Sequence, residues 1–139
     1  MSNENDIESA LRQAFLAAIP DAAAKTAFEN QPLDPAGLEK WYAFHYMPNR
    51  PDVATLGTGG ADAFTGVVQI DVNVPKGTGK GEIDADLAAL RSAFTPGKRL
   101  VYESANVIVY GCGRVPGSSH ENHYRFSISV SWECRLSRS

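Results

Sequence analysis

Apolar residues recur at helical spacing in two stretches of the chain. Near the N-terminus, intervals of three and four residues predict a helix that Asn5 or Asp6 caps and Pro20 ends. Its apolar stripe consists of Ile7, Leu11, Ala14, Phe15 and Ala18. The second stretch predicts a helix that stops at Pro96-Gly97. Its stripe consists of Ile83, Leu87, Leu90 and Phe94.

Between the two helices, the spacing changes to that of strands. In residues 41–47, apolar side chains occur at both odd and even positions, so both faces of a strand here would be apolar. Either both faces are buried in the fold or one face meets a partner. Residues 64–74 alternate between apolar and polar positions until Pro75, which predicts a strand with one buried face. A short extended piece is also possible at residues 25–29.

The last third of the chain predicts a β-hairpin. Residues 124–135 alternate over six steps, the clearest strand pattern in the sequence. We expect this arm to pair with residues 99–112 across a loop at 113–123. Two turn-rich stretches complete the pattern, a long loop at 49–63 and a glycine-rich turn at 76–81.

Together these elements predict one α+β domain over residues 1–139. We expect a mainly antiparallel sheet of four to five strands with two helices packed on it. The predicted order is helix, an optional short strand, two strands, helix and two strands. A chain of 139 residues with 43% apolar residues is long enough to bury a core of its own.

The two cysteines, Cys112 and Cys134, are expected to be free thiols. If the hairpin turns near Ser118, Cys112 lies opposite residue 124 and Cys134 lies opposite residue 102. Ten residues at about 3.3 Å each then separate the thiols by roughly 30 Å. A disulfide requires Cα atoms within about 7 Å of each other.

The amount and distribution of charge indicate which kinds of partner the protein can bind. The net charge is −3, so there is no positive excess for a basic nucleic-acid binder. Residues 1–39 carry seven acids and two bases, a net charge of −5, whereas residues 40–139 carry a net charge of +2. This asymmetry is typical of a solvated acidic helix, or of a dipolar subunit whose acidic part meets a neighbour.

The N-terminal segment and the hydropathy of the chain bear on its location. Residues 1–6 are polar and acidic, and no segment has the 18 or more apolar residues of a membrane span. We therefore predict neither a signal peptide nor a membrane partner.

The motifs that carry chemistry are weak, and we predict no cofactor, no metal and no catalytic residue. The turns at 57–62 and 76–81 lack the glycines and the Ser or Thr that phosphate-binding loops need. His120 and His123 are three residues apart in a predicted loop, whereas the zincin motif has a spacing of four on a helix. Asp84 and Asp86 fit the first turn of a helix, where acids favour the dipole.

Four blocks of the sequence carry a resemblance to a known family. They are the opening residues 6–16, the strand 64–75 with its glycine turn, the helix 84–91 and the closing strand 123–134. In this order they resemble the tail terminators, or tail completion proteins, of long-tailed phages, including minor tail protein U-like proteins. They are also similar to a small prophage family listed as a bacteriophage-related domain of unknown function.

The resemblance implies a structural protein without enzymatic activity. It implies a ring of six subunits that binds the end of the tail tube, stops its polymerisation and presents a surface to the head–tail connector protein. Such a subunit assembles in the cytoplasm of the bacterial host and remains in the virion tail. The alternatives are a neck or connector protein of similar fold, or a small α+β domain that binds a ligand.

We expect the partner interface in the two long loops and at the glycine turn. A closed ring needs two different patches on each subunit, which the acidic N-terminal part and the basic remainder can supply. The residues that we expect to face a partner are Arg50, Asp52, Asp62, Lys76, Lys80, Arg114, His120 and His123.

Overall fold

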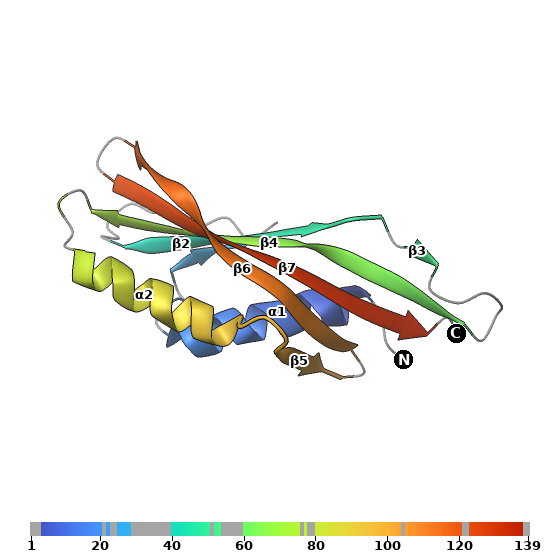
Figure 1. Cartoon of the computed structure of the whole chain (residues 1–139). Coiled ribbons are helices and arrows are strands. Elements are labelled where there is room, and N and C mark those ends of the chain that lie inside the picture. The colour runs from blue at the N-terminus through green and yellow to red at the C-terminus, as the bar shows by residue number, and fades with distance from the viewer. Residues whose placement is uncertain are drawn as a thin grey trace.

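In the computed structural model, two helices pack on one face of a long, twisted sheet (Figure 1). The described residues are 4–20, 22, 25–28, 40–50, 52–53, 60–75, 77, 80–103, 105–120 and 123–137. The helices are α1 (Glu4–Ala18) and α2 (Lys80–Ala93). The strands are β1 (Thr26–Ala27), β2 (Trp41–Pro48), β3 (Asp52–Val53), β4 (Ala61–Pro75), β5 (Arg99–Tyr102), β6 (Ala105–His120) and β7 (His123–Ser137).

The strand order of the sheet is β1-β2-β4-β7-β6-β5, and β3 pairs with the start of β4. Strand β1 is parallel to β2, whereas the other neighbours are antiparallel. Strands β4 and β7 pair along their whole length, from Ala61 opposite Ser137 to Pro75 opposite His123. Fifteen residues of β4 give the sheet a length of about 46 Å.

The core lies between the sheet and the two helices. The even-numbered residues of β4 and β7 point to the helices, among them Val68, Ile70, Phe126 and Trp132, all at most 1% exposed. From α1, Phe15 packs with its ring centroid 5.6 Å from that of Phe44. Burial of each such side chain contributes roughly 1.5–3 kcal/mol, so this layer holds the helices on the sheet.

The structure confirms the α+β class and corrects the number of strands. Two amphipathic helices and a mainly antiparallel sheet are present, but the described residues form a sheet of seven strands instead of four to five. One extra strand, β3, lies within the predicted loop 49–63. The other arises because the predicted arm 99–112 is divided between β5 and β6.

The predicted loop at residues 113–123 is wrong. Strand β6 continues to His120, and His120 pairs with His123 across the turn. The sequence of this stretch is rich in Gly, Pro and Ser, but an irregularity in pairing between Val115 and Ser118 accommodates these residues within the strand. At Gly117, the ring of Tyr124 occupies the space that a Cβ would need.

The later turn also shifts the register of the two cysteines. Cys112 lies opposite Val130 instead of residue 124, which brings it within four residues of Cys134 along the paired strand. Four residues span about 13 Å, still beyond the reach of a disulfide. Both cysteines are free, as predicted.

The helix boundaries differ slightly from those predicted. Helix α1 begins at Glu4, before both of the residues predicted to cap it. Helix α2 begins at Lys80, within the predicted glycine turn, and ends as predicted before Pro96-Gly97. Gly97 has a φ of 90°, a conformation that glycine adopts without the steric cost of a Cβ.

Candidate partner interface

Six of the eight residues predicted to face a partner divide between the two ends of the sheet. We call the end with the β6–β7 turn and the start of α2 the hairpin end (left in Figure 1). The other end, which holds β3 and the start of β4, is the terminal end, because the chain termini lie there in Figure 1.

The hairpin end holds three of the eight predicted residues. His120 and His123 pair across the turn, His123 also lies opposite Pro75, and Lys80 begins α2. Lys76 follows β4 directly but lies outside the described residues. The long β4 therefore separates this group from the residues of the terminal end.

The terminal end holds three further predicted residues. Asp52 pairs with Ala63 and Asp62 pairs with Val53, so β3 fixes both positions against β4. Arg50 follows β2 and is exposed. Arg114 belongs to neither end: it is exposed on β6, opposite Ile128.

A polar network that the sequence pattern did not reveal crosses the sheet face opposite the helices. Asp71 on β4 is only 3% exposed and accepts three hydrogen bonds. Its Oδ1 accepts from Ser127 Oγ at 2.5 Å and from Gln69 Nε2 at 2.9 Å, and its Oδ2 lies 2.9 Å from His45 Nε2. These bonds link β2, β4 and β7, so the network fixes the register of three strands.

The same bonds set the charge of Asp71. Burial acts to raise the pKa of the Asp71 carboxyl, but the hydrogen bonds from Ser127, Gln69 and His45 outweigh burial and hold the pKa below its ordinary value. Asp71 is therefore a stable carboxylate at neutral pH. The ring of His45 is held by its bond to this carboxylate.

The order of the bonds separates this network from a catalytic triad. In a triad, the imidazole lies between the hydroxyl and the carboxylate, so that it can take the proton of the hydroxyl. Here the carboxylate of Asp71 lies between His45 and Ser127. The arrangement joins strands and does not activate a nucleophile.

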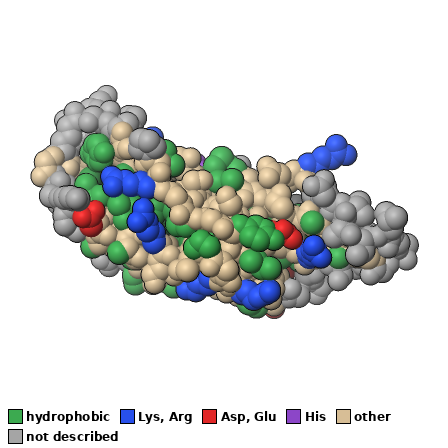
Figure 2. All heavy atoms as spheres, in the orientation of Figure 1, with side chains coloured by type: hydrophobic (Ala, Val, Ile, Leu, Met, Phe, Trp, Pro, Cys, Tyr) green, Lys and Arg blue, Asp and Glu red, His purple; other side chains and the backbone are tan. Residues whose placement is uncertain are grey.

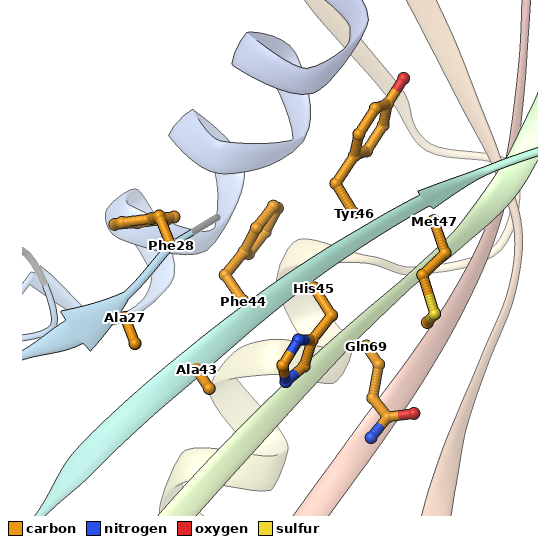
Figure 3. A pocket seen from close by; sticks show the side chains of 8 residues that line it. All are labelled: Ala27, Phe28, Ala43, Phe44, His45, Tyr46, Met47 and Gln69. Carbon is orange, nitrogen blue, oxygen red and sulfur yellow. The ribbon is translucent and has the colours of Figure 1, made fainter. Parts of the chain in front are cut away.

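A hollow of about 560 Å³ lies at the edge of β2 (Figure 3). Phe44 and Tyr46 project from β2 on the side of α1, whereas Ala43, His45 and Met47 project from the other side. The hollow therefore wraps round a strand edge and does not enclose a ligand between elements. Its described lining residues include His45 and Tyr46 but no Asp, Glu, Lys or Arg.

An ion pair joins the start of β2 to α2. Lys40 pairs with Asp86, whose carboxylate was predicted to serve the helix dipole alone. Burial acts to lower the pKa of Lys40, but the hydrogen bond to Asp86 and the interaction with Tyr42 outweigh it and raise the pKa. The carboxylate of Asp86 therefore helps to hold α2 against the start of β2.

The described part of the chain has neither a metal-binding cluster nor a membrane-spanning helix. Within it, no group of three or more His, Cys, Asp or Glu side chains is placed to hold a metal ion. Neither of its helices is long and apolar enough to cross a lipid bilayer.

Comparison with known proteins identifies the family. Residues 6–132 match the family described as phage tail terminator protein. The chain belongs to the phage tail terminator protein family. This is a structural family without enzymatic activity, so the protein has a structural role in a phage tail.

A solved structure shows that the fold of this tail terminator family member occurs in another protein. It has a TM-score of 0.70 at 18% identity, and the match covers 93% of this chain and 96% of that chain. The virion of a native gene transfer agent particle has a TM-score of 0.45 at 18% identity, covering 96% of this chain and 92% of that chain. No curated protein matches the sequence significantly.

Proposed function

We propose that this protein caps the tail tube of a long-tailed phage or prophage. In this role it binds the end of the growing tube, stops polymerisation and joins the finished tail to the head connector. The family match over residues 6–132 carries the proposal. The subunit assembles in the cytoplasm of the bacterial host and stays in the virion tail.

The shape of the sheet supports a protein that contacts two partners. A cap must bind the tube on one side and the connector on the other. Strand β4 is about 46 Å long, and predicted partner residues lie at both of its ends. The hairpin end and the terminal end are therefore suited to separate partners.

The cap is a ring, with six subunits as its expected number. A ring around a tube closes through a heterologous contact, in which two different patches of each subunit meet. The uneven charge of the chain, −5 over residues 1–39 and +2 over the remainder, supports two unlike patches. A connector subunit would use similar contacts, so the experiment has to separate the two roles.

Electron microscopy of particles from the parent phage with this gene deleted tests the proposal. We expect overlong tails of irregular length that are detached from heads, because nothing stops the tube. Tails of normal length that fail to join heads would contradict the cap and indicate a connector. Infectious particles of normal form would remove the protein from tail assembly. Expression of the wild-type gene from a plasmid should restore tail length and is the control.

A further inference from the structure

A surface patch near the terminal end carries both exposed apolar and charged side chains. It lies on the sheet face opposite the helices, where β5, β6 and β7 run side by side. Tyr110 is 57% exposed and Val101 is 64% exposed, unusually high values for large apolar residues. We define the outer patch as Arg99, Val101, Ile108, Tyr110, Glu133 and Arg135.

All residues of the outer patch except Val101 line a shallow hollow of about 370 Å³. In Figure 2, a red acidic side chain over β7 lies between green hydrophobic and blue basic side chains. Tyrosine and arginine are the residue types that most often dominate the binding energy of protein interfaces. A patch that combines them with exposed apolar surface therefore has the composition of a protein contact.

The charges within the patch do not balance. Glu133 accepts a hydrogen bond from the Tyr110 hydroxyl at 2.6 Å, and its other carboxylate oxygen lies 3.5 Å from Arg135 Nε. The carboxylate of Glu133 is thus engaged on both oxygens. Arg99 is exposed, and among the described residues no ion pair joins it to an acid. The patch therefore favours a partner that brings a carboxylate.

The acidic start of α1 has the complementary charge. Its first two turns carry Glu4, Asp6 and Glu8, with no basic residue before Arg12. In Figure 1, the N-terminal end of α1 and the end of β7 lie at the same end of the molecule. In a closed ring whose axis runs along the long strands, two patches that meet must lie at the same level along that axis, and two patches at the same end of the subunit meet this requirement.

We propose that the outer patch binds the acidic first two turns of α1 of a second copy of this chain. The contact is heterologous, with Arg99 facing the carboxylate of Glu8. Tyr110 and Val101 supply the apolar surface that the contact buries. This inference rests on the proposed function, because it requires that the subunit form a ring on the tube.

Charge reversal and its rescue test the contact. Wild-type protein and variants are added to purified tail tubes of the same phage, and bound protein is measured by sedimentation and counted per tube end by native mass spectrometry. Arg99→Glu should weaken assembly roughly tenfold, and Glu8→Arg should weaken it similarly. The double variant Arg99→Glu with Glu8→Arg should recover most of the loss. Arg91→Glu, an exposed arginine on α2 outside the outer patch, is the matched control.

Each outcome decides the inference. Recovery in the double variant, with the control unchanged, supports it. Normal assembly of Arg99→Glu would overturn the contact while leaving the cap intact, and so would loss without recovery. Loss of tube binding by a variant that still forms rings would instead assign the patch to the tube protein. Failure of the wild-type protein to bind or assemble would overturn both the contact and the proposed function.

Discussion

The rings of Tyr46 and Trp132 stack across the sheet, with centroids 5.6 Å apart and planes inclined by 10°. Tyr46 is on β2 and Trp132 is on β7, which are separated by β4. The contact is possible because Gly66, the residue of β4 opposite Trp132, has no side chain. The indole lies over the glycine backbone, so three strands are joined by one aromatic pair.

The first prediction concerns Gly66. A Cβ at this position would lie 2.6 Å from Trp132 Cζ2, 2.7 Å from the carbonyl oxygen of Met47 and 2.9 Å from Pro48 Cα. Gly66→Ala should therefore lower the free energy of unfolding by about 1–3 kcal/mol, the usual cost of overpacking. Urea unfolding measures the change. Gly113→Ala is the control, because a Cβ there meets open space; an equal loss in both variants would contradict the crowding at Gly66.

The second prediction concerns Asp71. Its pKa is held below the ordinary value of about 3.9, so the folded state binds the proton less readily than the unfolded chain does. The stability that this provides is complete above the ordinary pKa and is lost as the pH falls through the lower, folded pKa. Urea unfolding between pH 7 and pH 2 should show this loss in the wild-type protein.

The variant Asp71→Asn should weaken that acid dependence. It should also lower stability at pH 7 by about 1–3 kcal/mol, because donors of the network lose their charged acceptor. Asp84→Asn on α2 is the control, since Asp84 is exposed. If Asp71→Asn retained the full acid dependence of the wild-type protein, the network would not be its source.

The third prediction concerns the cysteines. Burial raises the pKa of both thiols, so each forms less thiolate at neutral pH than an exposed cysteine. In native protein, a thiol reagent should react slowly with half-buried Cys112 and not with Cys134, which is 1% exposed. Unfolded protein that has not been reduced should give two thiols. Detection of none would indicate a disulfide and contradict the pairing of β6 with β7.

The fourth prediction concerns the residues expected to face a partner. Arg50 and Arg114 are both exposed, so Arg50→Glu and Arg114→Glu should leave the melting temperature nearly unchanged. Each should weaken binding to tail tubes in the sedimentation assay, because a repulsive charge enters the contact. Arg91→Glu serves again as the control. Unchanged binding of both variants would exclude these two side chains from the tube interface.

The local pattern of the sequence determined the class of the fold. Period-2 alternation in residues 124–135 identified β7, and the stripes of both helices are buried in the core as their spacing predicted. These patterns are local, because burial of one face imposes a period on each element whatever its neighbours are. The blocks in residues 6–134 were also sufficient to indicate the family.

Only the tertiary structure decided the strand order, the turn of the last hairpin and the polar network. Gly, Pro and Ser in residues 113–120 favour a loop locally, but pairing with β7 keeps them in a strand through an irregularity between Val115 and Ser118. Asp71 and Gln69 occupy ordinary polar positions of an alternating strand, and His45 lies in a strand rich in apolar residues. Register alone brings them together with Ser127. The separation of the predicted partner residues into two ends likewise follows from pairing between distant segments. The period of a strand does not specify which other strand it pairs with. The sequence pattern therefore determined most of the helices and strands. The contacts between these elements determined which residues lie together on the surface of the protein.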